Sequence, residues 1–82
     1  MDEQKPEWQI TLIAAVRSQM AARAHSQHQA AVEMGMASQS QLNDLLHGRI
    51  QIGLLNARRM AEYAGIGKKE KHAIVNYFME NA

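Results

Sequence analysis

Cysteine is absent from the 82-residue chain, so disulfide bridges, thiolate metal ligands and thiol nucleophiles are excluded. Proline occurs once and aromatic residues make up only 5% of the sequence, whereas alanine, leucine and methionine are abundant. Because alanine and leucine are strong helix formers and helix breakers are few, the composition predicts an all-α fold. A chain of this length without internal repeats is expected to form one domain, residues 1–82.

Long apolar runs are absent as well. The longest, residues 12–16, is far shorter than the roughly 20 residues needed to span a bilayer. The opening Met1-Asp2-Glu3 is acidic and therefore unlike a signal peptide. These features predict a cytoplasmic protein with no membrane partner.

The net charge is only +1, but its distribution is uneven. Residues 1–16 carry a net charge of −2, residues 17–47 carry none, and residues 48–82 carry +3. The positive charge after residue 47 is consistent with a nucleic-acid partner and equally with an ordinary solvated surface.

Motifs for catalysis or metal binding are missing. The histidines are scattered, at His25, His28, His47 and His72. None forms an i, i+4 pair beside a carboxylate, and there is no glycine-rich phosphate loop or nucleophile motif. We therefore expect no enzymatic activity, no metal site and no cofactor.

Two serines mark helix starts about a dozen residues apart. Ser26 is followed three residues later by Gln29, and Ser38 by Gln41. This spacing predicts capping boxes, in which the serine hydroxyl accepts from a first-turn N–H and the glutamine side chain accepts from the serine N–H. Gly35 lies between the two starts and is expected to end the first helix, because glycine readily adopts the left-handed conformation found after a helix.

Hydrophobic periodicity predicts five helices, at about residues 6–24, 27–34, 39–47, 54–64 and 68–80. The first is expected to bury Trp8, Leu12, Val16 and Met20 and to expose Gln9, Arg17, Gln19 and Arg23. The second presents Ala30, Ala31 and Met34 inward, and the core candidates of the fourth are Leu55, Met60, Ala61 and Ala64. Together these elements predict a compact five-helix bundle.

The third helix is expected to bury three leucines, Leu42, Leu45 and Leu46, and to end at Gly48. Its outer face then carries Gln39, Ser40, Asn43, Asp44 and His47. Such amide and hydroxyl groups can both donate and accept hydrogen bonds, as the reading of base edges requires. Two hypotheses follow for residues 26–48: a helix-turn-helix whose second helix enters the major groove of DNA, or an ordinary helical hairpin.

A longer pattern bears on this choice. Gln27-x-x-x-Ala31-x-x-x-Gly35, the Ser-Gln-Ser-Gln-Leu opening of the third helix and the closing Gly48-Arg49 resemble the lambda-repressor-like helix-turn-helix regulators of bacteria and phages. Residues 55–66, which end in Gly65-Ile66, are similar to the fourth helix of that family. The resemblance covers residues 10–66, with one residue more between Gly35 and Gly48 than is usual in the family.

The resemblance implies a sequence-specific transcriptional regulator, a repressor of bacterial or phage origin. It implies that Gln27 contacts a phosphate and braces Gln39, that Gln39, Ser40, Asn43 and Asp44 face base edges or backbone, and that Arg49 binds a phosphate. The full set expected at DNA is Gln27, Ser38, Gln39, Ser40, Gln41, Asn43, Asp44, His47 and Arg49. For Asp44 two roles stay open, namely acceptance from a cytosine amino group and repulsion of phosphate.

One short helix reads few base pairs, so we expect a homodimer on a pseudo-palindromic duplex operator. The surplus apolar residues of the last helix predict a dimer interface that contains Ile74, Tyr77 and Phe78. The alternative is that these side chains only fasten the last helix to its own domain. A second function also stays open, in which the same fold binds and inhibits another protein.

Overall fold

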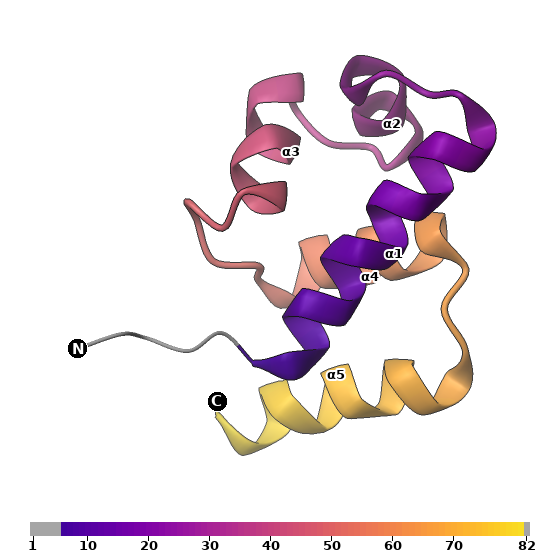
Figure 1. Cartoon of the computed structure of the whole chain (residues 1–82). Coiled ribbons are helices and arrows are strands. Elements are labelled where there is room, and N and C mark those ends of the chain that lie inside the picture. Colours follow the sequence, from indigo (N-terminus) through magenta and orange to yellow (C-terminus); the bar gives the residue numbers. More distant parts are fainter. Residues whose placement is uncertain (1–5, 82) are drawn as a thin grey trace.

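The computed structural model describes residues 6–81, which form five helices and no strand. They are α1 (Glu7–Arg23), α2 (Gln27–Glu33), α3 (Gln39–Leu46), α4 (Leu54–Ala64) and α5 (Lys68–Glu80) (Figure 1). The all-α prediction is confirmed, and each helix lies within about two residues of its expected bounds. No helix in this part of the chain is both long and apolar enough to cross a membrane.

The longest helix, α1, organises the others. It crosses the molecule diagonally and packs along α4, while α2 packs against α3 at one end of the molecule (Figure 1). Helix α5 lies at the opposite end, where it contacts both α1 and α4. This arrangement leaves one side of α3 uncovered by the other helices.

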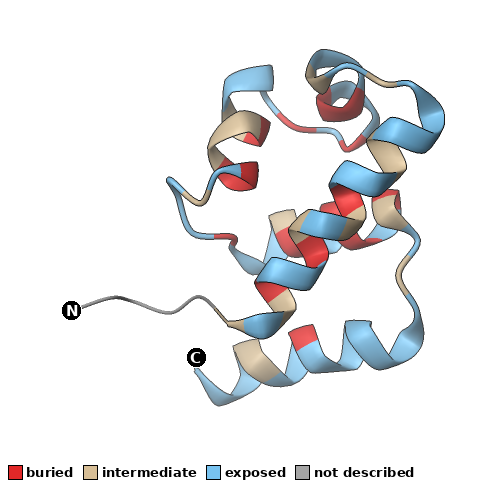
Figure 2. Ribbon diagram, in the orientation of Figure 1, coloured by how far each residue is buried: buried red, intermediate tan, exposed pale blue. Residues whose placement is uncertain are grey.

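A single buried cluster connects all five helices, and the buried residues lie on their inner sides (Figure 2). Its members are Leu12, Val16, Ala30, Ala31, Met34, Met36, Leu42, Leu45, Leu46, Ile52, Ala57, Met60, Ala61, Tyr63 and Ile74. The inward faces predicted for α2 and α3 are confirmed by this set. Burying such side chains contributes about 1.5–3 kcal/mol for each large one, which offsets the entropy lost on ordering the helices.

Three aromatic rings attach α5 to the start of α1. The Trp8 ring centroid lies 5.3 Å from that of Tyr77 and 5.4 Å from that of Phe78. Tyr77 and Phe78 are in turn 5.4 Å apart in an edge-to-face arrangement. Such pairs add about 0.5–1.5 kcal/mol each beyond their buried area. The cluster therefore fixes the terminal helix on its own domain.

The ends of α2 and the C-terminal end of α3 follow the predicted caps. Ser26 and Gln29 form the reciprocal capping box, with both hydrogen bonds present. Gly35 and Gly48 each have a φ of +72°, so both positions use the left-handed conformation that favours glycine. The backbone N–H of Arg49 then donates to the Asp44 carbonyl, which closes the end of α3.

Two burial predictions were wrong. Gln9, expected on the outer face of α1, is only 6% exposed. It stands seven residues before Val16, and seven residues are about two helical turns, so both share the inner face. Leu55, expected in the core, is 60% exposed because it lies about 200° around α4 from the fully buried Ala57.

Candidate nucleic-acid interface

The N-terminus of α3 is capped by a serine. The Ser38 hydroxyl accepts from the Gln41 backbone N–H at 3.1 Å, as the spacing predicted. The second half of the predicted box was wrong, because the Gln41 side-chain oxygen accepts from the Ala37 N–H at 3.3 Å instead of from Ser38. Gln41 is thus engaged in holding the turn before α3 and is half-buried.

The faces of α3 separate as expected. Its three leucines are buried, whereas Ser38, Gln39, Ser40 and His47 are exposed. Asn43 and Asp44 are half-buried and lie on the same outer side, about one turn further along the helix. His47 Nδ1 is 2.9 Å from the Asn43 carbonyl oxygen, which orders this imidazole at the end of the helix. The outer face therefore offers a row of uncharged polar groups beside one carboxylate.

Arg49 lies immediately beyond the turn and is bound to α3. Its Nη1 donates to Asp44 Oδ1 at 3.2 Å, and the two side chains are 57% and 39% exposed. This ion pair was not anticipated from the sequence, since the partners are five residues apart and no straight helix would bring them together. The turn at Gly48 is what returns the chain to Asp44.

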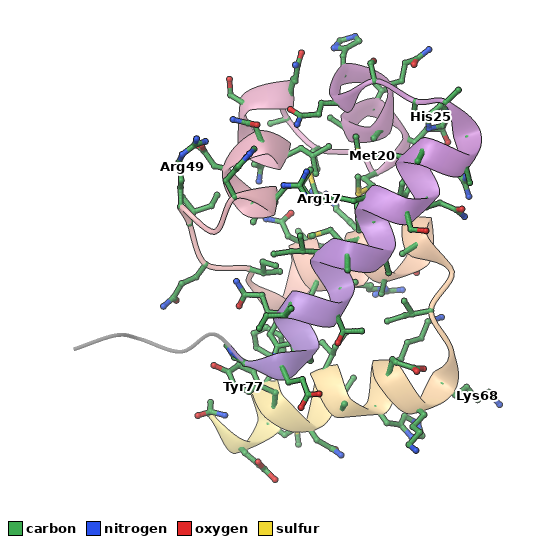
Figure 3. All side chains as sticks on the ribbon, in the orientation of Figure 1. Arg17, Met20, His25, Arg49, Lys68 and Tyr77 are labelled. Carbon is green, nitrogen blue, oxygen red and sulfur yellow. The ribbon has the colours of Figure 1, made fainter. Side chains whose placement is uncertain are left out.

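A second arginine braces α3 from outside. Arg17 of α1 donates from Nη2 to the Leu46 carbonyl at 3.3 Å (Figure 3). Carbonyl groups at a helix C-terminus lack intrahelical donors, and a cation there also complements the helix dipole. Arg17 was predicted only to lie on a solvated face, because a contact between residues so far apart leaves no local signal in the sequence.

Gln27 lies at the start of α2 and is half-buried. Within residues 6–81 no side-chain hydrogen bond joins it to Gln39, so the implied brace between these two amides is not formed. Helices α2 and α3 are instead held together by packing of Ala30, Ala31 and the α3 leucines in the common core.

A polar cluster joins the far end of α1 to α4. His25 Nδ1 lies 2.8 Å from the Tyr63 hydroxyl, and the Arg23 guanidinium stacks 4.7 Å from the centre of the Tyr63 ring. Arg23 and Gln19 also donate to the Tyr63 carbonyl, at 3.4 Å and 3.5 Å. Burial raises the pKa of Tyr63 above 10.0, Arg23 lowers it and Glu33 raises it further. The cluster stabilises the scaffold that carries α2 and α3.

The residues predicted to mediate dimerisation are largely occupied within the chain. Ile74 is buried in the core, and Tyr77 and Phe78 are half-buried against Trp8. The large apolar side chains of α5 that are exposed are Val75 and Met79, at 49% and 75%. The exposed apolar residues of α5 are therefore not the three that were predicted to form the dimer interface.

The excess of positive charge in the second half of the sequence does not gather at α3. Arg49 lies beside α3, whereas Lys68, at the start of α5, is at the far side of the molecule (Figure 3). The described residues contain no cluster of three or more potential metal ligands. Comparison of the chain with protein-family models, curated proteins and solved structures finds no match.

Proposed function

We propose that the chain is a sequence-specific DNA-binding transcriptional regulator of the lambda-repressor-like helix-turn-helix type, acting as a repressor. In this proposal α2 and α3 form the helix-turn-helix, and α3 enters the major groove. The observation that carries the proposal is the division of α3 into a buried leucine face and an exposed row of polar side chains.

The individual groups suit their proposed roles. Gln39 and Ser40 stand exposed in the first turn of α3, where helices of this type meet base edges. Glutamine and asparagine can bind adenine through two hydrogen bonds, which favours Gln39 and Asn43 as reading residues. Ser38 and Gln41 hold the N-terminus of α3, and Arg17 holds its C-terminus. The reading helix is therefore fixed at both ends.

Long-range electrostatic attraction is expected to contribute little to the affinity of this chain for DNA. The net charge is +1, so long-range attraction to DNA is weak and specificity has to come from contacts at the groove. Two copies on a pseudo-palindromic operator would double these contacts. We propose Val75 and Met79 as the apolar centre of the dimer, since Tyr77 and Phe78 already pack on Trp8.

The direct test is a selection of bound duplexes from a random pool, followed by measurement of affinity as salt is raised. A regulator of this kind enriches one motif and binds it at least about a thousandfold more tightly than random DNA. A pool that yields no enriched motif, together with no measurable affinity for random duplex at low salt, would refute the proposal.

One observation favours a second candidate, a protein-binding module. A groove of about 280 Å³ lies between α4 and α5, with an apolar lining that includes Leu54, Ala57, Ala61, Ile74 and Val75. Leu54 and Val75 are about half exposed at this groove. Apolar grooves between two helices accept amphipathic helices of partner proteins. Stable complex formation that is competed by DNA would join the two functions, and complex formation without any DNA affinity would favour this one.

A further inference from the structure

The Asp44–Arg49 pair combines two contacts at one residue. The Arg49 N–H donates to the Asp44 carbonyl at 2.9 Å, and its guanidinium donates to the Asp44 carboxylate at 3.2 Å. The backbone hydrogen bond fixes the position of the Arg49 main chain. Its side chain is 57% exposed, so it has room to rotate away from Asp44. Exposed ion pairs of this kind contribute little to stability, so the guanidinium can exchange the carboxylate for a phosphate at little cost.

Near DNA, the Asp44 carboxylate is destabilised if it loses its cation. Asp44 is an acceptor only, and it lies on the outer face of α3 among groups proposed to meet the major groove. If Arg49 leaves for a phosphate, the Asp44 carboxylate faces the polyanion without its cation. It then needs a new donor to remain satisfied.

Cytosine supplies such a donor. In the major groove its edge presents only the N4 amino group, whereas guanine and thymine present acceptors and adenine places the acceptor N7 beside its amino group. Opposite a cytosine, Asp44 can accept from N4–H while Arg49 moves to a phosphate, so both charged groups keep a hydrogen-bond partner. Opposite another base, Asp44 retains Arg49.

We propose that Asp44 controls the access of Arg49 to the DNA backbone and releases it where a cytosine lies opposite. This inference rests on the proposed DNA-binding function. It makes Asp44 a specificity-determining residue, because the identity of one base is converted into the presence or absence of a phosphate contact. The acid also lowers binding to all other sequences.

The test uses the full chain with Asp44→Asn, Arg49→Ala and the double variant, measured on random and selected duplexes by fluorescence anisotropy. Asp44→Asn is expected to raise affinity for random DNA up to about fivefold and to shift the preference at one base pair from cytosine towards adenine. Glu80→Gln, an equal charge change on α5, serves as the control and should change affinity much less.

The double variant separates control of Arg49 from simple repulsion of phosphate. If Asp44 acts by holding Arg49, the gain from Asp44→Asn falls by at least half when residue 49 is alanine. An equal gain in both backgrounds overturns the inference, because repulsion alone does not depend on Arg49. An unchanged base preference overturns the cytosine assignment.

A second measurement needs no DNA. Inorganic phosphate is titrated while the Arg49 side-chain NMR signals are followed in the parent and in Asp44→Asn. The variant is expected to bind phosphate at Arg49 at least about twofold more tightly, and identical titrations would contradict control by Asp44. Loss of all duplex binding in every variant would refute the proposed function, while the phosphate titration would still decide the role of the ion pair.

Discussion

Arg17 of α1 donates a hydrogen bond to the Leu46 carbonyl, and this contact joins the central helix to the end of α3 across 29 positions of the chain. We expect this contact to help set the orientation of α3 on the core. Replacement of Arg17 by alanine is expected to lower the free energy of unfolding by about 0.5–1.5 kcal/mol. It should also weaken binding to the selected operator more than binding to random DNA, because a tilted helix loses base contacts first.

Arg17→Lys provides the control for charge. A lysine keeps the cation but has only a compact ammonium, so it should restore random-sequence affinity and only part of the specific affinity. Chemical denaturation and anisotropy together check both effects. Equal losses on both kinds of DNA in Arg17→Ala would show that the contact does not orient α3.

The amides on the outer face of α3 give a second prediction. Gln39→Ala and Asn43→Ala are each expected to weaken binding to the selected site by about 1–3 kcal/mol and to leave random-sequence binding almost unchanged. Asn76→Ala, which removes an exposed amide from α5, should change neither. Unimpaired binding of the preferred site by both α3 variants would exclude them as reading residues.

Tyr63 makes the stability of the scaffold dependent on pH. Burial raises its pKa above 10.0 in the folded chain, so the unfolded chain releases this proton at lower pH than the folded one. The contribution is complete below pH 10.0 and is lost as the pH rises above that value. Unfolding free energies measured from pH 8 to about 11.5 should therefore fall more steeply for the parent than for Tyr63→Phe.

The steepness of that curve is the relevant quantity. Tyr63→Phe also removes the hydrogen bond to His25, which lowers stability at every pH by about 0.5–1.5 kcal/mol. Tyr77→Phe, which removes a hydroxyl from a half-buried tyrosine of α5, is the matched control for the loss of a phenol. Identical slopes for the parent and Tyr63→Phe would argue against the raised pKa.

Self-association is predicted to depend on α5. Val75→Asp and Met79→Asp should convert a dimer at micromolar concentration into a folded monomer, because each places a charge on the exposed apolar face. Phe78→Ala should mainly destabilise the chain, since it removes the ring packed on Trp8. Sedimentation velocity with circular dichroism distinguishes these effects, and a monomeric parent would contradict the proposed dimer.

Local chemistry explains why the helices were predictable. Serine caps and glycine stops are short-range signals, so Ser26, Ser38, Gly35 and Gly48 located the ends of α2 and α3 from sequence alone. The leucines of α3 likewise predicted which side would be exposed. The polar face proposed to read DNA is therefore encoded within a few residues.

The two wrong burial predictions relied on the polarity of a side chain rather than on its position around the helix. Gln9 is buried because it stands two turns before Val16, and Leu55 is exposed because it lies opposite Ala57. Contacts between distant segments could not be predicted at all. Arg17 with Leu46 and His25 with Tyr63 depend on how α1 packs against the rest of the fold, which no local pattern specifies.

The proposed role of α3 in DNA binding is tested most directly by mapping the DNA-contacting surface of the folded chain in solution. Amide NMR signals are compared before and after addition of the selected duplex. If α3 enters the major groove, the largest changes fall in residues 38–49 and at Gln27, with little change in α5 beyond the dimer surface. Changes concentrated on α4 and α5, with α3 unaffected, would contradict it.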